Sequence, residues 1–150
     1  MRKINKSGID LIKEFEGLSL IPYLDSVGVP TIGYGNTYYE NRSPVNMTDK
    51  AISKKRAEEL LLNVVINFAK GVTGLLHNNI NDNQFAALVS FAYNLGLGNL
   101  KKSTLLKKVN ANTNDPTIAA EFMRWNKAGG MILNGLTRRR KMEAELYFKK

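Results

Sequence analysis

Apolar residues recur at helical spacing at the start of the chain. They predict an amphipathic helix over residues 7–16, with Ser7 as its N-cap and Asp10 three positions on, close to a capping box. Gly17 is expected to end this helix, because glycine commonly follows the last helical turn. The apolar positions of the predicted helix are Ile9, Ile12 and Phe15.

The next segment changes from helical spacing to a strand-like composition. Residues 18–39 mix β-branched and aromatic residues with glycines and prolines, which predicts a small, tightly turned antiparallel sheet. Pro22 and Pro30 cannot donate a backbone hydrogen bond, so they favour edge positions. Residues 40–52 are expected to be irregular.

A second helical pattern follows the sheet and is expected to join two halves of the molecule. It covers about residues 53–70, with Ser53 as its cap and an end near Gly71. Its opposite face carries charged residues and is expected to be solvated. The apolar face consists of Ala57, Leu60, Leu61, Val64, Val65 and Phe68.

The rest of the chain, about residues 81–150, is helical in pattern. Asn81 is expected to cap a helix that buries Phe85, Leu88, Val89 and Ala92 and stops before Gly96. Three more helices are expected: one starting at Ser103 or Thr104, one from Asp115-Pro116 to Trp125, and a basic one from Thr137 to Phe148, with Gly129-Gly130 breaking the chain before the last.

These elements predict an α+β fold. A small antiparallel sheet subdomain precedes a larger helical subdomain, and a cleft between the two is where a polymer would lie. The 150 residues fit one domain with a sizeable core.

Composition narrows the chemistry. The sequence has no cysteine, which excludes disulfides and thiol catalysis, and the single His77, expected at the surface, cannot build a histidine-rich metal site. We therefore expect neither metal nor cofactor. No apolar run approaches 18 residues and no apolar segment follows the basic N-terminus, so neither a transmembrane helix nor a secretory signal peptide is expected.

The charge points to polyanionic partners. Lys and Arg number 22 against 13 Asp and Glu, a net charge of +9, and such a field speeds encounter with polyanions. Nucleic acid, anionic lipid and bacterial cell wall all fit this charge, and the charge alone does not choose among them.

Two carboxyl groups lie close together in the sequence, one at the end of the first predicted helix and one in the turn beyond it. Eight residues separate Glu16 from Asp25, and five separate Asp25 from Thr31. Glycosidic bond hydrolysis needs one carboxylic acid and one carboxylate in different environments. The helix end and its apolar neighbours favour a protonated Glu16, whereas Asp25 lies in a turn where backbone N–H groups favour the ionised form. The alternative is that both are ordinary solvated groups and that Thr31 merely packs in a strand.

The residues around this spacing resemble the active-site signature of the phage-type lysozymes, glycoside hydrolase family 24. The residues that carry the resemblance are Phe15-Glu16-Gly17, Tyr23, Asp25, Gly28 and Thr31-Ile-Gly-Tyr-Gly35. The segment from Asn81 to Gly96 and the segment Gly135-Leu-Thr-Arg-Arg-Arg140 are also similar to the family, in the same order. Asn36 stands where many members have a histidine, which puts a local ion pair in doubt but not the chemistry.

The resemblance implies a muramidase that cleaves the β-1,4 bond between N-acetylmuramic acid and N-acetylglucosamine. Glu16 would be the general acid, Asp25 the base or stabiliser, and Thr31 would position water, with inversion of configuration. Tyr93 and Asn94 would bind sugar at the cleft, although core and helix-end roles fit them about as well.

Other conspicuous side chains are assigned mainly structural roles. Trp125 is expected in the core rather than as a sugar platform, and Tyr34 across the small sheet. One of Arg138, Arg139 and Arg140 would reach towards Glu16 by resemblance, and the remaining two are expected on a solvated face.

The resemblance also implies a setting for the activity. The expected partner is bacterial peptidoglycan, reached from the host bacterial cytoplasm with the help of a separate pore-forming holin, at lysis of the cell. We expect a monomer with no specific nucleic acid partner, because no recognised nucleic-acid motif is present.

The rival interpretation is a basic protein that disrupts anionic membranes without catalysis. It would use the basic segment from Thr137 to Lys150, because basic helices with apolar contacts can lie on membranes. The apolar contacts would be Leu136, Met142, Leu146, Tyr147 and Phe148. Docking of this segment on the helical subdomain is the favoured alternative.

Overall fold

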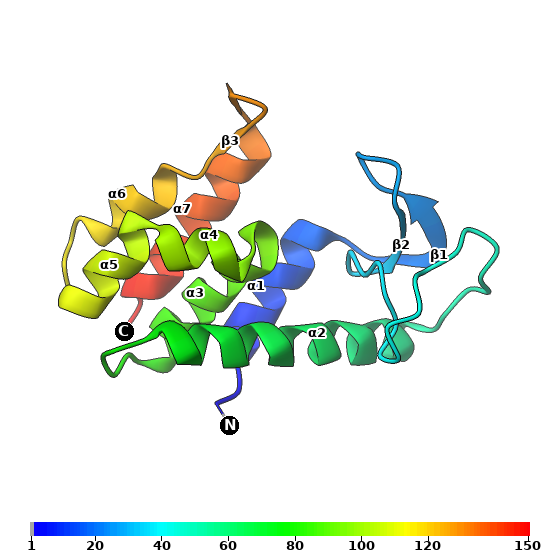
Figure 1. Ribbon diagram of the computed structural model, residues 1–150, viewed down its shortest axis with the longest axis horizontal. Coiled ribbons are helices and arrows are strands. Elements are labelled where there is room, and N and C mark those ends of the chain that lie inside the picture. Colours follow the sequence, from blue (N-terminus) through cyan, green and yellow to red (C-terminus); the bar gives the residue numbers. More distant parts are fainter. Residues whose placement is uncertain (1) are drawn as a thin grey trace. The chain divides into compact units, whose positions relative to one another are not determined.

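The computed structural model describes residues 2–150, and its element order confirms the expected α+β class (Figure 1). Helix α1 comes first, a small sheet follows it, and the rest of the chain is mainly helical. The elements are α1 (Lys6–Glu16), β1 (Ser19–Leu24), β2 (Pro30–Gly33), α2 (Lys54–Leu75), α3 (Asp82–Leu95), α4 (Leu97–Lys102), α5 (Thr104–Ala111), α6 (Ile118–Met123), β3 (Lys127–Ala128), β4 (Met131–Ile132) and α7 (Asn134–Phe148).

The chain divides into two compact units. We call Lys13–Asn67 the β-rich unit; the helical unit combines the N-terminal segment through Ile12 with Phe68–Lys150. Helices α1 and α2 each begin in one unit and end in the other. The helical unit is therefore built from two pieces of sequence, and the β-rich unit from one.

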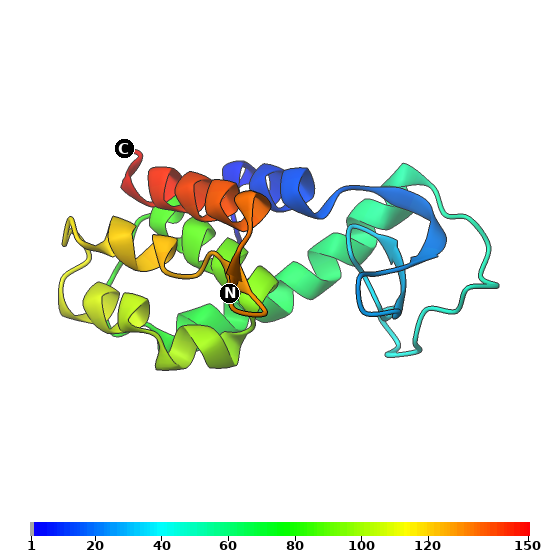
Figure 2. The same cartoon turned by 90° about the horizontal axis from the view of Figure 1, so that it is seen from above.

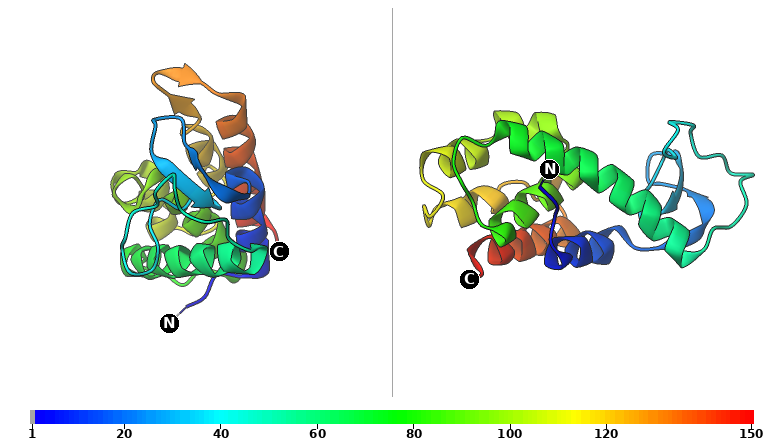
Figure 3. Two further views of the ribbon diagram at one scale, coloured as in Figure 1. Left: turned by 90° about the vertical axis from the view of Figure 1, so that its right-hand side faces the viewer. Right: turned by 90° about the horizontal axis from the view of Figure 1, so that it is seen from below.

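Strands β1 and β2 pair antiparallel in the β-rich unit, with Tyr23 opposite Thr31 and an irregular register between Ser19 and Tyr23. Pro22 and Pro30 lie in this two-stranded sheet, where each strand is an edge, as expected. Residues 40–52, cyan in Figure 3, contain no named helix or strand, as expected, but the sheet ends at Gly33, short of the predicted residue 39, and only isolated bridges such as Tyr38 to Pro44 follow it. Ile32, Val45 and Leu60 form a buried core in this unit.

The start of α2 was predicted correctly but its end was not. Ser53 Oγ accepts a hydrogen bond from the Arg56 backbone N–H at 3.0 Å, as a cap should. The helix runs past Gly71 to Leu75. An added Cβ at Gly71 would lie 2.3 Å from Cδ1 of Leu97, so the glycine is needed there because α4 packs directly on α2. Tertiary packing thus overrides the usual helix-ending tendency of glycine.

Helix α3 is the centre of the helical unit. Nine consecutive residues, Gln84 to Ala92, are buried, so the helix is enclosed on all sides, and it contacts α7 and α4. Asn81 caps it with a complete capping box: its side chain accepts from Gln84 N–H, and the Gln84 side chain accepts from Asn81 N–H. Both the cap and the buried face were predicted.

Several helix boundaries differ from the expectations, each for a local reason. Asn5, not Ser7, caps α1, because Asn5 Oδ1 accepts the Gly8 N–H at 3.0 Å. Ser103 caps α5, one of the two expected starts. Asp115 holds a turn by accepting from the backbone and hydroxyl of Thr117, so α6 begins only at Ile118 and ends at Met123, before Trp125.

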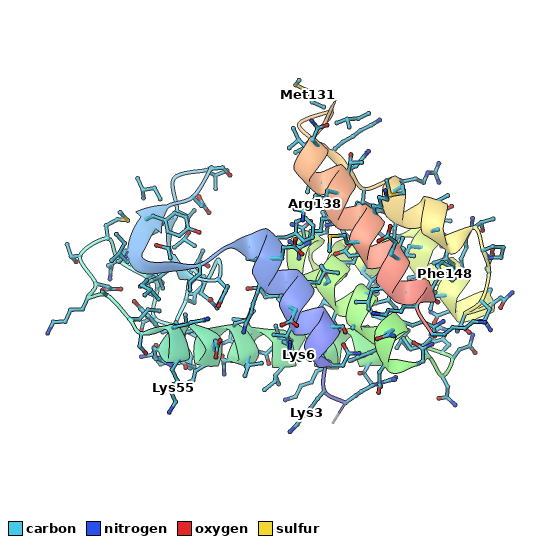
Figure 4. All side chains as sticks on the ribbon, turned by 180° about the vertical axis from the view of Figure 1, so that it is seen from behind. Lys3, Lys6, Lys55, Met131, Arg138 and Phe148 are labelled. Atoms are coloured by element: carbon cyan, nitrogen blue, oxygen red, sulfur yellow. The ribbon has the colours of Figure 1, made fainter. Side chains whose placement is uncertain are left out.

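The segment before α7 contains structure that was not expected. Gly129 and Gly130, both with positive φ, form the turn of the β3–β4 hairpin rather than a simple break. Met131 lies at the tip of this hairpin (Figure 4). Helix α7 begins at Asn134, before the predicted Thr137.

Helix α7 docks inside the helical unit. It packs on α3 and α6, and Figure 2 shows α6 and α7 side by side. Leu146 and Tyr147 are buried there, and the Tyr147 hydroxyl donates to the Thr113 carbonyl at 2.8 Å. These apolar residues are therefore buried in the helical unit and do not face outward. This burial does not favour the membrane-disrupting alternative.

Candidate active site

Glu16 is the last residue of α1, and the chain turns directly after it. Gly17 has φ +70, the left-handed geometry of a helix C-terminal glycine, and its N–H donates to the Lys13 carbonyl at 3.0 Å. Lys13 also pairs with Glu58 of α2 at 3.0 Å, which anchors this end of the helix within the β-rich unit. The Glu16 side chain is half-buried.

The backbone at Gly35 lies against the Glu16 carboxyl group. An added Cβ at Gly35, whose φ is +80, would come within 2.6 Å of Oε1 of Glu16. Only a residue without a side chain leaves the carboxyl group its present place, so the Thr31-Ile-Gly-Tyr-Gly35 segment shapes the surroundings of Glu16 directly.

Asp25 is held by the turn that follows β1. Its Oδ1 accepts the backbone N–H groups of Val27 at 2.9 Å and Val29 at 2.8 Å, as the turn composition predicted. These two donors fix the orientation of the carboxyl group. In the described part of the chain Oδ2 makes no hydrogen bond, so it is open to a ligand.

Thr31 is buried on β2. Its hydroxyl donates to the Val29 carbonyl at 2.8 Å, so its oxygen lone pairs remain to accept a hydrogen bond. The Val29 backbone thus contacts both side chains, since its N–H bonds Asp25 and its carbonyl bonds Thr31.

Tyr23 lies next to the site. The family resemblance included this residue, but no role was predicted for it. It is half-buried and faces Thr31 across the sheet. Burial, then Glu16, then Asp25 raise the pKa of the Tyr23 phenol. Tyr23 therefore neighbours Thr31 by strand pairing, and the charges of both carboxylates disfavour ionisation of its phenol. Strand pairing is the only signal that would have revealed this.

Asn36 is buried, and its side chain is a neutral amide. Its Nδ2 donates to the Leu60 carbonyl at 3.3 Å, and Oδ1 has no hydrogen-bond partner. Asn36 therefore joins α2 through a hydrogen bond between uncharged groups.

Tyr93 and Asn94 lie near the end of α3 in the helical unit, both half-buried. The Tyr93 ring lies 5.5 Å from that of Phe68, centroid to centroid. Asn94 Oδ1 accepts a hydrogen bond from Arg140, which fixes the amide and leaves its NH2 group as a donor. Each residue therefore combines a packing contact with partial exposure.

The expectation for the arginines was partly wrong. Arg139 and Arg140 are buried rather than solvated, and both approach Glu143, whose Oε2 also accepts from Ser90 at 2.5 Å. Arg138 is exposed at the start of α7 (Figure 4). Burial raises the pKa of Glu143, although the two guanidinium groups act to lower it. Burial also lowers the pKa of Arg140, to about 10.

Among the remaining aromatic residues, Trp125 is half-buried rather than enclosed in the core. Trp125 packs edge-on against buried Phe91, with centroids 5.5 Å apart. Tyr34 is buried in the β-rich unit, and His77 is exposed.

Two further findings concern residues 2–150 only. No group of three His, Cys, Asp or Glu side chains there is arranged to hold a metal ion. No helix over the same residues combines the length and apolarity needed to cross a membrane.

The α+β architecture, with a glutamate at the end of the first helix and a small antiparallel sheet behind it, defines a lysozyme-like protein. Comparison with known proteins makes this specific. The model of the family described as phage lysozyme matches residues 13–143. The chain therefore belongs to the phage lysozyme family.

Individual relatives agree with this assignment. The endolysin of Bacillus phage B103 is 46% identical over 146 residues, which cover 96% of this chain and 53% of that protein. The endolysin from Escherichia coli O157:H7 phage FAHEc1 superposes with a TM-score of 0.91 at 38% identity, covering 98% of this chain and 94% of that one. A P22 lysozyme mutant gives 0.86 at 32%, covering 99% and 100%.

Two of the relatives are much longer than this chain. The chain spans about half the length of the Bacillus phage endolysins that it matches.

Proposed function

We propose that this chain is a muramidase with residues 1–150 as its catalytic domain. It hydrolyses the β-1,4 glycosidic bond between N-acetylmuramic acid and N-acetylglucosamine in peptidoglycan. Membership of the phage lysozyme family supports the class of substrate. The observation that carries the proposal is that Val29 bonds both Asp25 and the buried Thr31, while the Glu16 carboxyl group lies against Gly35 of the same unit.

Each residue has a role that its contacts support. Glu16 protonates the leaving oxygen. Asp25, oriented by two backbone N–H groups, stabilises the developing positive charge and acts as base towards water. Thr31 accepts a hydrogen bond from that water, because its own proton is donated to Val29. No cofactor takes part in this mechanism.

We propose an inverting outcome. Water then attacks from the face opposite the leaving group, and the carboxyl groups of an inverting enzyme stand about 6.5–9.5 Å apart to leave room for it. NMR of the first-formed product would report the anomer. Retention of configuration would refute the role given to Asp25 and replace it with a covalent one.

Tyr93 and Asn94 are proposed to bind the glycan. A half-buried ring offers a face to a sugar, and the Asn94 amide, held through Oδ1 by Arg140, offers its NH2 group to an acetamido or hydroxyl oxygen. Replacement of either residue is expected to raise KM more than it lowers kcat, because these contacts are made to ground state and transition state alike.

The proposal is tested with purified, peptide-intact peptidoglycan. Wild type should clear it and generate new reducing muramic acid ends, identified by mass spectrometry, whereas Glu16→Gln should fold and leave the walls intact. Glu59→Gln, on the exposed face of α2, is the matched control and should clear normally. Clearing by Glu16→Gln at the wild-type rate would refute the assignment.

The biological setting is part of the proposal. The enzyme is proposed to act as a monomer, to accumulate in the host bacterial cytoplasm and to reach the wall through a separate holin at lysis. Family membership is its support. Expression in cells with and without a holin tests it, since lysis without the holin would contradict this route.

A further inference from the structure

A pocket lies in the β-rich unit, and none of Glu16, Asp25 and Thr31 lines it. Its volume is about 590 Å³, and its walls come from the loop after β2 and from one face of α2. The loop side contributes Tyr38, Tyr39, Glu40 and Arg42, and the helix side includes Asn63 and Asn67.

The loop wall is a turn held by backbone hydrogen bonds. Tyr39 N–H donates to the Ser43 carbonyl at 3.0 Å, Arg42 N–H to the Tyr39 carbonyl at 2.9 Å, and Val45 N–H to the Thr37 carbonyl at 2.9 Å. The Tyr39 hydroxyl donates to Asp49 at 2.7 Å, which fixes that ring too. The pocket is therefore largely formed before any ligand binds.

Arg42 occupies a backbone position that normally takes glycine or asparagine. Its φ of +68 makes it the sole non-glycine residue with positive φ in the described chain. The residue closes a tight hairpin turn, where glycine would cost less. An arginine at such a position is explained if its guanidinium group is used.

The charge of Arg42 is available. Among residues 2–150 its side chain has no ion-pair or hydrogen-bond partner, and it is exposed. The neighbouring carboxylate, Glu40, is instead taken by Arg56 in a two-pronged ion pair, one branch of which measures 2.7 Å. The pocket thus presents one unpaired positive charge at its rim.

The helix wall supplies amides. Asn63 and Asn67 are four positions apart, so they lie on the same face of α2, and both are exposed. Neither side chain makes a hydrogen bond within the described residues. Tyr38, 58% exposed and bridged through its backbone to Pro44, adds an aromatic face.

We propose that this pocket is an auxiliary binding site for a carboxylate-bearing, N-acetylated glycan. The Tyr38 ring lies on a sugar face, the amides of Asn63 and Asn67 bind acetamido and hydroxyl groups, and Arg42 pairs with a carboxylate. The choice of a muramyl peptide as this glycan rests on the proposed function. The site would hold the wall polymer beyond the residues that cleave it.

The test uses the Glu16→Gln protein, so that no ligand is consumed. Amide NMR spectra are recorded during titration with N-acetylmuramyl dipeptide and, in parallel, with uncharged tri-N-acetylchitotriose. The muramyl peptide should shift the side-chain amide signals of Asn63 and Asn67 and the backbone signal of Arg42. No shift at these positions at saturating concentration would overturn the site.

Arg42→Gly separates binding from folding. It should weaken the muramyl peptide about tenfold, the effect of losing a charge-assisted hydrogen bond, and weaken chitotriose much less. Its Tm should be equal to or above that of the parent, because glycine relieves the left-handed backbone. Lys55→Ala removes an exposed charge elsewhere on α2 as a control. An unchanged affinity in Arg42→Gly would refute the role of Arg42.

The two proposals fail separately. If Glu16→Gln cleaves walls, the muramidase assignment fails whatever the titration gives. If wild type cleaves, Glu16→Gln does not and the pocket signals stay fixed, the auxiliary site alone is wrong.

Discussion

A single missing side chain at Gly35 keeps room for the carboxyl group of Glu16. Alanine there would bring its Cβ within 2.6 Å of Oε1 and force a left-handed backbone on a residue that resists it. We expect Gly35→Ala to lower wall clearing by about tenfold to a hundredfold, because misplacing a reacting group by about 1 Å has effects of this size. Clearing rates, compared at equal folded fraction, measure it.

Gly129→Ala is the matched control for this change. Gly129 also has a positive φ, of +58, but an added Cβ would meet nothing within 4 Å. Both variants should lose similar stability, and only Gly35→Ala should lose activity. An equal loss of activity in both would mean that backbone strain, not the contact with Glu16, is responsible.

At the residue scale the sequence was informative where a side chain bonds its own neighbourhood. Asp25 could be placed because a turn aspartate accepts nearby N–H groups. The neighbourhood of Tyr23 could not, because its cross-strand partner Thr31 comes from β2. Arg139, Arg140 and Glu143 lie within one helix, but their burial could not be predicted because it depends on contacts with Ser90 of α3. Consecutive arginines indicate a solvated face until a buried carboxylate is known to lie among them.

Helix α2 carries two glycines that should respond oppositely to alanine. At Gly74 an added Cβ meets nothing, so Gly74→Ala should raise the free energy of unfolding, towards the lower end of about 0.5–1 kcal/mol because the last turn frays. Gly71→Ala collides with Leu97 and should cost about 1–3 kcal/mol. Urea denaturation measures both, and shifts of the same sign would contradict the close packing of α2 on α4.

Helices α5 and α6 are tied by a charge that acid should remove. Lys108 donates to Glu121 at 2.8 Å; this bond lowers the pKa of Glu121 below 4.5, burial opposes it, and Arg124 adds to the lowering. As the pH falls, Glu121 is therefore protonated at a higher pH in the unfolded chain than in the folded protein. The stabilisation is present above about pH 4.5 and is lost as pH falls through the folded pKa.

We accordingly expect Glu121→Gln to flatten the fall of Tm between about pH 5 and pH 3. Glu145→Gln, an exposed site on α7, should keep the wild-type slope. A Glu121→Gln curve parallel to wild type would show that the pair contributes nothing to acid sensitivity.

At the element scale, prediction succeeded where caps and periodicity agree, as at Asn81 and Ser53. It failed where the deciding contact is distant. Helix α2 continues through Gly71 because α4 packs there, and the short α4 and the β3–β4 hairpin carry too few residues for a period to be read.

The net charge of +9 belongs to the molecule as a whole. It should speed encounter with anionic walls, so clearing should slow as salt rises from about 0.01 M to about 0.1 M and the Debye length shrinks from about 30 Å to about 10 Å. Walls whose carboxyl groups have been amidated are the control and should show little dependence. Equal salt dependence on both substrates would exclude steering by charge.

The fold class could be predicted at this scale because strands and helices segregate along the chain. The division of the chain into two units could not be predicted, because the helical unit takes its first piece from before the sheet and its second from after it. A local pattern does not report that residues far apart in sequence share a core.

Both ends of the described chain meet at one side chain. Asn83 on α3 accepts a hydrogen bond from Asn5 at 2.9 Å and donates one to the Lys149 carbonyl at 3.1 Å. A short linker can therefore join the ends, and the chain can be reopened in the exposed turn at Asn78 and Asn79. In such a circular permutant the ribosome would deliver α3 to α7 and then α1 in one run, instead of holding α1 unpartnered while the whole β-rich unit is made.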